Sequence, residues 1–501
     1  MDMRRLIFII ATLLVAVCGG VAVVHAAPPQ FEQTPLGFDA ARHLLLRTSY
    51  AAPPAEIAAF ARLTREQAVD RLLSSTDKPR VTQPPAWVNE PVVPASRIRV
   101  MGVEERRDYQ RNNVARGLDM RGWWLQEMVV TPSPLTEKMV LFWHNHFVSS
   151  QQKVRQPQYL YRQNVLLREH ALGNFATLLH AIARDPAMVI YLDNASNRKG
   201  QPNENFAREV MELFTLGEGH YSERDIKDAA RAFTGWSIDG EKSVFLFRAN
   251  AHDDGEKTVL GRSGNFDGDA VLDILLAQPQ AAEFIVRKLW REFVSPDVAE
   301  ADAIEVQRIT KVFRDSRYDI RVVLRTLLMS DAFDAASHRA TLVKSPVDLV
   351  VGTLRAFQLT TGDVQPFALS VAQLGQNLFS PPNVKGWPGG QAWINSTTLL
   401  ARKQFLDRLF RAEEMRVAPM SASNIPPPQA VPPLNLMRQR LQRALAEVQF
   451  DSERWLRQAG TDAAQVQRVV LAMAPQHALP AGASGMELIR RLTQDPVYQL
   501  K

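Results

Sequence analysis

The sequence has 501 residues, of which 46% are hydrophobic and 22% charged, a composition typical of a globular protein rather than a disordered one. The formal net charge of +6 comes from Lys and Arg residues spread among acids, so no clustered basic stripe indicates nucleic-acid binding. Cys18 is the only cysteine, so the chain beyond it has no disulfide, thiolate nucleophile or cysteine-ligated metal.

The first residues have the pattern of a bacterial secretion signal. Arg4 and Arg5 are positively charged, residues 6–24 carry no charge, and Ala26 ends a signal-peptidase site of small residues. We therefore expect a signal peptide over residues 1–26 and a periplasmic or secreted protein with no transmembrane domain after cleavage. The apolar run is long enough to span a bilayer, so an uncleaved N-terminal anchor is the alternative.

Most of the remaining chain has the hydrophobic periodicity and start signals of α-helices. Thr64 opens a capping box, and Ser133 and Ser345 each precede a proline at the first helical position. Asp319 is placed to cap another amphipathic helix. Residues 243–261 alternate apolar and polar residues around an Asp-Asp-Gly turn, which predicts a small β-hairpin.

These elements predict a mainly α protein with three parts after the signal peptide. Residues 36–412 form a multi-helix globular domain with the small β-hairpin as an insertion. Residues 413–433 are rich in proline and read as a linker. Residues 434–501 then form a short helical C-terminal tail.

Five stretches concentrate polar and aromatic residues in patterns that indicate chemistry. They are Phe142–Phe147 (FWHNHF), Asn203–Gly217 (NENFAREVMELFTLG), Ala230–Trp236 (ARAFTGW), His252–Lys257 (HDDGEK) and Ser380–Gly390 (SPPNVKGWPGG), the last continuing to Asn395.

Together these stretches, with Ala41–Leu45 near the start, resemble the bacterial family called domain of unknown function 1800. The resemblance covers roughly residues 36–412. It implies an exported or envelope-associated helical protein with no established activity, often encoded beside a second exported family that resembles sulfatases. It brings no catalytic assignment to this chain.

The stretch 203–217 is expected to be a helix with acids beside its apolar stripe. At 100° per residue, Asn205, Glu209 and Glu212 lie within an arc of about 60°, and Glu209 lies nearest the stripe. A half-buried carboxylate needs a partner, for which Arg231, Lys385, a histidine or a metal are candidates. Glu209, Glu212 and Arg231 are thus candidate catalytic residues and Asn205 a candidate ligand-binding residue; a structural Glu–Arg pair is the alternative.

A divalent metal site is a second hypothesis, with His144, His146 and Asp253 as its ligands. His144 and His146 lie about 200° apart on a regular helix, so they converge on one ion only if the backbone leaves the helix near Asn145. Packed, hydrogen-bonded histidines and a polar turn at Asp253 are the alternatives.

The loop after residue 380 is the most ligand-like feature. Trp387 and Trp393 offer flat apolar faces, and Asn383, Lys385 and Asn395 offer directional hydrogen bonds. Aromatic faces beside amides suit sugars. The alternative is a loop that plugs the helical core with its tryptophans buried.

These observations leave two classes of function open. The sequence has no nucleophile elbow, no phosphate-binding Gly-rich loop and no dinucleotide fingerprint. We favour non-catalytic binding of an envelope polysaccharide, another extracellular polymer or a partner such as a co-encoded exported protein. The alternative is a hydrolase, metal-dependent or not, that uses Glu209 or Glu212 with His144 and His146. ATP, nicotinamide and nucleic acid are not expected partners outside the cytoplasm.

Overall fold

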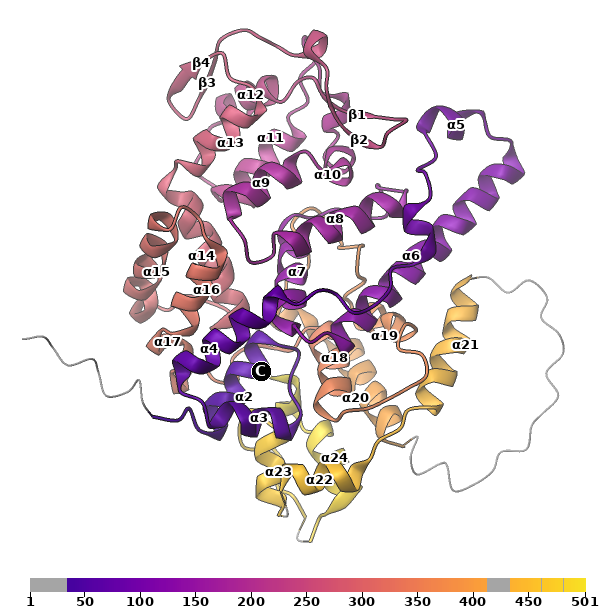
Figure 1. Ribbon diagram of the computed structural model, residues 1–501, viewed down its shortest axis with the longest axis vertical. Coiled ribbons are helices and arrows are strands. Elements are labelled where there is room, and N and C mark those ends of the chain that lie inside the picture. The colour runs from indigo at the N-terminus through magenta and orange to yellow at the C-terminus, as the bar shows by residue number, and fades with distance from the viewer. Residues whose placement is uncertain (1–33, 412–432, 461, 481) are drawn as a thin grey trace, which may run out of the picture.

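The computed structural model describes residues 34–411, 433–460, 462–480 and 482–501. These residues are mainly helical, as the sequence predicts, with two small antiparallel sheets of two strands each (Figure 1). The predicted signal peptide and almost all of the predicted linker lie outside them. Within the described ranges, no helix has both the length and the hydropathy needed to cross a membrane.

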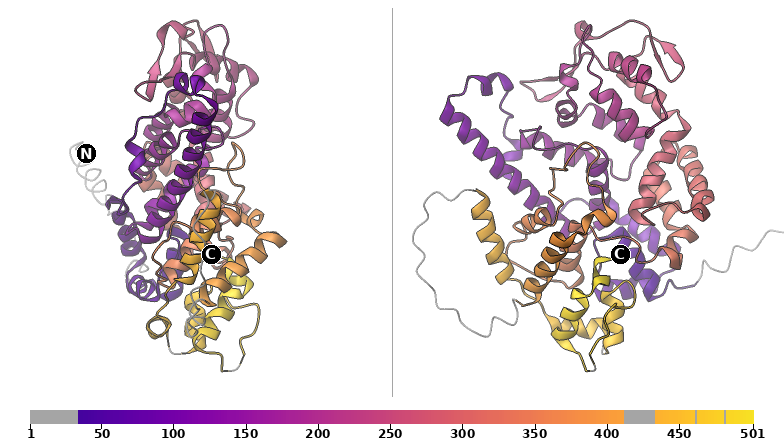
Figure 2. Two further views of the ribbon diagram at one scale, coloured as in Figure 1. Left: turned by 90° about the vertical axis from the view of Figure 1, so that its right-hand side faces the viewer. Right: turned by 180° about the vertical axis from the view of Figure 1, so that it is seen from behind.

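The N-terminal helices cross an elongated, flattened molecule from the lower left of Figure 1 to its upper right (Figures 1 and 2). The predicted capping box is confirmed, because the Thr64 side chain accepts from the Gln67 amide and the Gln67 side chain accepts in return. The helices are α2 (Phe38–Thr48), α3 (Pro54–Ala61), α4 (Arg65–Ser74), α5 (Ala95–Val100), α6 (Val103–Val130), α7 (Pro134–His146) and α8 (Pro157–Glu169).

The next part of the chain lies at the top of Figure 1 and holds every strand that the structure describes. Its elements are α9 (Phe175–Ala183), α10 (Pro186–Tyr191), α11 (Asn205–Glu209), the π-helix η5 (Val210–Thr215), α12 (Glu223–Ala232), β1 (Trp236–Asp239), β2 (Val244–Phe247), β3 (Lys257–Val259), β4 (Arg262–Gly264) and α13 (Gly268–Leu276).

The predicted single hairpin over residues 243–261 is wrong in its pairing. Its two apolar runs are strands, but β2 pairs with β1 and β3 pairs with β4. The β3–β4 turn uses Leu260 and Gly261, both with positive φ, as a two-residue hairpin turn of this twist requires. The Asp-Asp-Gly stretch lies between β2 and β3, which do not pair, and Asp253 accepts instead from Arg231 of α12 at 2.8 Å.

The assumption of a regular helix across residues 203–217 fails after Glu209. From Val210 the backbone widens into η5, in which the Leu216 amide reaches the carbonyl of Met211, five residues back, at 2.8 Å. The Thr215 hydroxyl similarly donates to the carbonyl of Val210 at 2.6 Å. A π-helix advances each residue by a smaller angle than an α-helix, so the 100° projection does not hold for Glu212.

The C-terminal half of the chain is helical throughout its regular elements. The Ser345 cap is confirmed, with its side chain accepting from the Asp348 amide at 3.0 Å, and Asp319 caps α16 as predicted. The helices are α14 (Pro279–Phe293), α15 (Ala303–Asp315), α16 (Ile320–Leu328), α17 (Asp331–Asp334), α18 (Pro346–Ala356), α19 (Phe367–Gln373), α20 (Ser396–Arg411), α21 (Pro433–Ala446), α22 (Ser452–Ala459), α23 (Ala463–Val470) and α24 (Gly485–Gln494).

The predicted tail, residues 434–501, packs on the helical body. The Arg42 guanidinium on α2 donates to the carbonyl of Ala472 at 3.0 Å, and the Lys501 amide donates to the carbonyl of Leu342 at 2.7 Å. Buried apolar side chains from both ends of the described chain form one continuous core. The last residues therefore lie next to α7 and α18, where the cavity described below is found.

Candidate functional site

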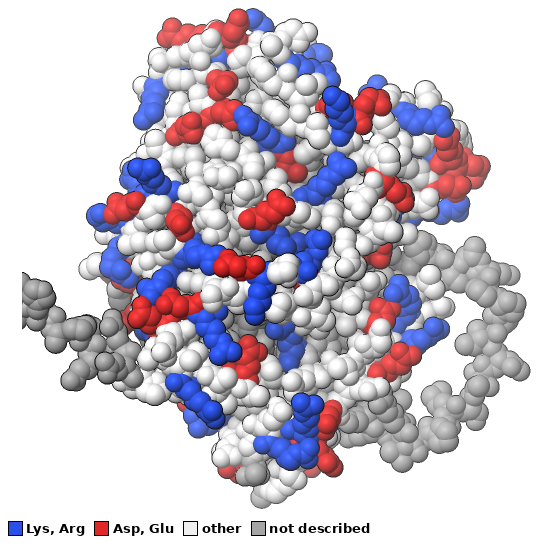
Figure 3. All heavy atoms as spheres, viewed as in Figure 1, with Lys and Arg blue, Asp and Glu red and all other residues white. Residues whose placement is uncertain are grey.

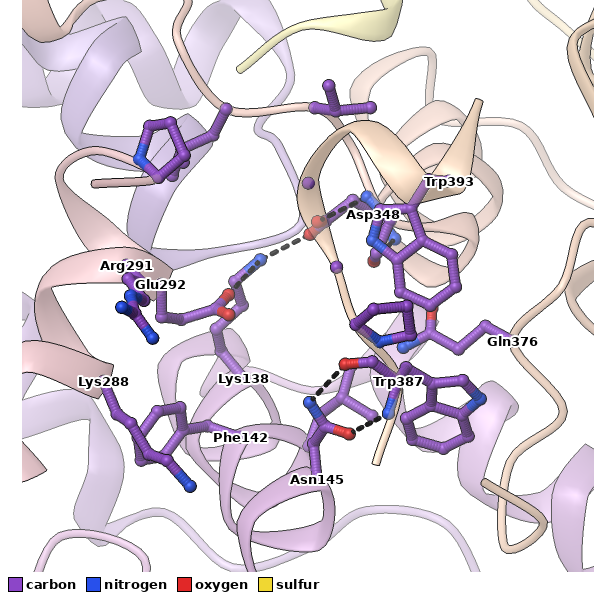
Figure 4. A pocket seen from close by; sticks show the side chains of 18 of the residues that line it. Lys138, Phe142, Asn145, Lys288, Arg291, Glu292, Asp348, Gln376, Trp387 and Trp393 are labelled. Atoms are coloured by element: carbon purple, nitrogen blue, oxygen red, sulfur yellow. Dashed lines mark hydrogen bonds and ion pairs between the residues drawn. The ribbon is translucent and has the colours of Figure 1, made fainter. Parts of the chain in front are cut away.

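A cavity of about 380 Å³ lies between α7, α14, the loop over residues 385–393 and Lys501 (Figure 4). Its volume falls in the range typical of small-molecule sites. Lys138 and Asp348 at its floor are buried, whereas Arg291, Lys385 and Pro388 at its rim are exposed. The cavity is therefore open to solvent at one end and closed by charged side chains at the other.

The floor is a network of four charged side chains whose charges cancel. The Asp348 carboxylate accepts from Lys138 through one oxygen and from Lys501 through the other, the latter at 2.7 Å. Glu292 lies 3.6 Å from Lys138 and 3.5 Å from Lys501. Although burial alone would raise it, the two lysines hold the pKa of Asp348 well below its ordinary value. The floor thus needs no further counter-ion.

One wall of the cavity has positive charges that no carboxylate balances. Lys288 and Arg291 are three residues apart on α14, and no acidic side chain of the described residues lies within ion-pair distance of either. Lys288 instead donates to His146 Nδ1 at 2.9 Å and to the carbonyl of Leu213 at 3.1 Å. Burial, together with the positive charge of Arg291, lowers the pKa of Lys288 to about 7.

The opposite wall is the loop that contains Trp387 and Trp393 (Figure 4). Asn145 fixes it to the end of α7, because its Oδ1 accepts from the Trp387 amide at 2.7 Å and its Nδ2 donates to the Trp387 carbonyl at 3.3 Å. Gly386 has φ +82°, and a Cβ there would lie 2.3 Å from Asn145 Oδ1, so only glycine allows this approach. The loop position depends on these two residues.

The tryptophans are buried, as the plug interpretation of this loop expects. Trp387 is 5% exposed and Trp393 is 8% exposed, so neither is an open surface platform for a sugar. Both nevertheless line the cavity. An aromatic contact with a ligand is available only from inside the cavity.

The predicted amide residues have local roles outside the cavity lining. Asn383 accepts from the Lys385 amide at 2.9 Å and closes a turn, and Asn395 accepts from the Thr398 amide at 2.9 Å at the start of α20. Asn205 donates to Asp193 at 3.2 Å. Each therefore stabilises the backbone or a loop near its own position.

The structure brings Glu209, Glu212 and Lys385 together, next to the rim of the cavity. Lys385 Nζ lies 3.8 Å from Glu212 and donates to Glu218 at 3.0 Å. Glu212 also accepts from the Tyr221 hydroxyl at 2.7 Å. Burial and the negative charge of Glu212 raise the pKa of Glu209. Of the candidate partners for Glu209, Lys385 is thus the one that lies close to this acid pair.

Arg231 belongs to a separate group. It donates to Asp253 at 2.8 Å and to Asp228 at 2.9 Å. Its hydrogen bonds hold the pKa of Asp253 down at about 2. Arg231 therefore ties α12 to residues 253–256 and does not pair with Glu209.

The predicted metal ligands do not come together. His144 Nε2 accepts from the Phe379 amide at 3.2 Å, His146 uses both ring nitrogens, and Asp253 is bound to Arg231. Burial lowers the pKa of His144 to about 3 and that of His146 well below its ordinary value. Across the described part of the chain, no three His, Cys, Asp or Glu side chains form a group that could hold a metal ion.

Sequence reasoning identified Lys385, Trp387, Trp393 and His146 among the cavity residues but missed the basic wall and the floor. The residues missed are Lys138, Lys288, Arg291, Asp348, Gln376 and Lys501. Lys288 had a signal, because it lies 60° from Ile285 on an amphipathic helix and so at the border of the buried face. The floor pairs join residues 210 and 153 positions apart, which no local pattern reveals.

The fold and the site define a mainly helical protein with a basic cavity opening between a histidine-bearing helix and a tryptophan loop. The chain belongs to the family described as protein of unknown function (DUF1800), whose model matches residues 43–500. The match includes the predicted C-terminal tail. Neither the curated proteins nor the solved structures gave a match to the chain.

Proposed function

We propose that this protein binds an anionic ligand in the cavity without transforming it. The inferred ligand is an acidic group of an extracellular polymer or of a partner protein. We further infer that binding takes place outside the cytoplasm, which rests on the secretion pattern of residues 1–26.

The observation that carries the proposal is the uncompensated charge of Lys288 and Arg291. Two cations on neighbouring turns of one helix repel each other, and a partly desolvated cation without a carboxylate is costly. A bound oxyanion would supply the missing charge to both. Over the face seen in Figure 3, by contrast, Lys and Arg are interspersed with Asp and Glu, so the net charge forms no broad basic patch there.

The hydrolase alternative has one observation in its favour. The raised pKa of Glu209 is a property that general acids share, and Glu209 is close to Lys385 at the cavity rim. Neither Glu209 nor Glu212 lines the cavity, however. A ligand seated between Lys288 and the tryptophan loop would therefore not contact these acids directly, which is why we favour binding.

Titration calorimetry with sulfate and with phosphate tests the binding proposal. We expect saturable binding that weakens at least about tenfold in Lys288→Gln and in Arg291→Gln. Arg287→Gln is the matched control, because Arg287 lies on the same helix, is exposed and pairs with Glu283 at 2.7 Å. It removes the same charge and should bind as the parent does. Absence of binding, or equal weakening in all three variants, would contradict the proposal.

A further inference from the structure

We infer that the ligand of the cavity is an acidic saccharide, with its anionic group between Lys288 and Arg291 and its ring against Trp393. This inference rests on the proposed anion binding and adds the chemical class of the ligand.

The two walls of the cavity differ in chemistry. Figure 4 shows Lys288 and Arg291 on one side and Trp387 and Trp393 on the other. A small inorganic ion can contact only the basic side. A ligand that contacts both walls needs an anionic group and a body with an apolar face, which a carboxylated or sulfated sugar ring provides.

The tryptophan wall also offers hydrogen-bond donors without partners. Gln376 is 3% exposed, and its Oε1 accepts from the Val347 amide at 3.0 Å. Its amide nitrogen makes no hydrogen bond to the described residues, although Gln376 lines the cavity. The indole nitrogen of Trp393 likewise has no protein partner within the described ranges. Neither nitrogen is sealed inside the protein, so each is free to donate to an oxygen of a ligand bound in the cavity.

The remaining polar groups of the cavity exclude other positions for the anion. The floor charges are paired with one another, as described above, and Asp348 and Glu292 there would repel an anion. Lys385 at the rim is paired with Glu218. The anionic group is therefore directed to Lys288 and Arg291, and the rest of the molecule toward Gln376 and Trp393.

The carboxylated and sulfated forms share the same oxyanion chemistry, and the test separates them. Binding of D-glucuronate, glucose 6-sulfate, acetate, sulfate and D-glucose to the full chain would be measured by calorimetry. We expect glucuronate to bind at least about tenfold more tightly than acetate, or glucose 6-sulfate than sulfate, with glucose much weaker. Whichever pair shows the difference identifies the anionic group.

The outcomes separate this inference from the proposal on which it rests. If sulfate binds but neither sugar exceeds its inorganic or acetate counterpart, the saccharide inference is wrong and anion binding stands. If no anion binds, both are wrong. Trp393→Leu should lower the sugar affinity about tenfold and leave sulfate binding unchanged; equal sugar affinity in parent and variant would overturn the placement of the ring. Retained sulfate binding shows that the variant is folded. If the variant no longer binds sulfate, the comparison of the five ligands on the parent protein still decides the inference.

Discussion

Lys288 is the donor and His146 the acceptor in a hydrogen bond of 2.9 Å between Nζ and Nδ1. The Nε2 of His146 donates to the carbonyl of Phe214 at 3.2 Å, which fixes the neutral tautomer of the ring. Leu213 and Phe214 lie in the last turn of the π-helix η5, so two of the carbonyls near its end are satisfied by these two side chains. The same lysine therefore both caps a helix end and lines the cavity.

The low pKa of Lys288 makes anion binding dependent on pH. Below pH 7 its amine is an ammonium and attracts the ligand, whereas above pH 7 it loses the proton and the attraction. We expect sulfate affinity to be constant below about pH 6 and to fall toward about tenfold per pH unit above pH 8. Lys288→Arg should bind across the whole range, because the guanidinium stays charged. A parent whose affinity is flat from pH 6 to 9 would show that Lys288 is not the contact.

Asp348 is the shared partner of two buried lysines, so its removal should destabilise the fold. Asp348→Asn leaves Lys138 and Lys501 without their closest carboxylate, and we expect a loss of about 3–5 kcal/mol in the free energy of unfolding, measured with urea. The depressed pKa of Asp348 means that its contribution is present above its unfolded value near 3.8 and is lost as the pH falls below it.

Asp254→Asn is the matched control for this prediction. Asp254 pairs with Lys199 at 2.6 Å, but it is 74% exposed, so solvent screens the interaction. Its loss should change stability far less than that of Asp348. Similar losses in the free energy of unfolding for the two substitutions would mean that the buried network stabilises the fold no more than a surface ion pair does.

The helices were predictable from sequence because their start signals are local. Thr64, Ser345 and Asp319 cap helices through bonds to amides three residues away, a distance that a pattern can reveal. The strand partners were not, because alternation marks a strand but does not say which other strand it pairs with, and here β2 pairs with β1 and β3 with β4. The cavity was only half predictable. Its aromatic loop is a single continuous segment that a sequence pattern can reveal, whereas Lys288 and His146 come from different helices and meet only through tertiary packing.

The loop that forms the tryptophan wall should depend on Gly386 more than on Gly389. Both have positive φ, and Gly389, with φ +73° and ψ −171°, lies in a region open almost only to glycine, so alanine at either position is strained by about 1–3 kcal/mol. Only at residue 386 would the new Cβ also lie 2.3 Å from Asn145 Oδ1 and 2.7 Å from the Asn145 carbonyl, whereas nothing lies within 4 Å at residue 389. We expect Gly386→Ala to lower the melting temperature at least about twice as much as Gly389→Ala. Equal shifts would mean that Asn145 does not fix the loop.

Asp185 should make the protein less stable as the pH rises from 4 to 7. This buried carboxylate caps α10 and accepts from Gln163 at 2.8 Å, and burial raises its pKa to about 7. The folded state then holds a proton that the unfolded chain releases above its ordinary value of 3.8, so stability falls through this window and levels off above pH 7. Asp185→Asn keeps an oxygen for the cap and removes the charge. We expect the difference in unfolding free energy between variant and parent to shift in favour of the variant by a few kcal/mol from pH 4 to pH 8, since one pKa unit is worth about 1.4 kcal/mol. Asp267→Asn, an exposed cap of α13, serves as the control and should show no such gain. If the difference in unfolding free energy between parent and variant is the same at pH 4 and at pH 8, the assignment of the raised pKa to Asp185 is wrong.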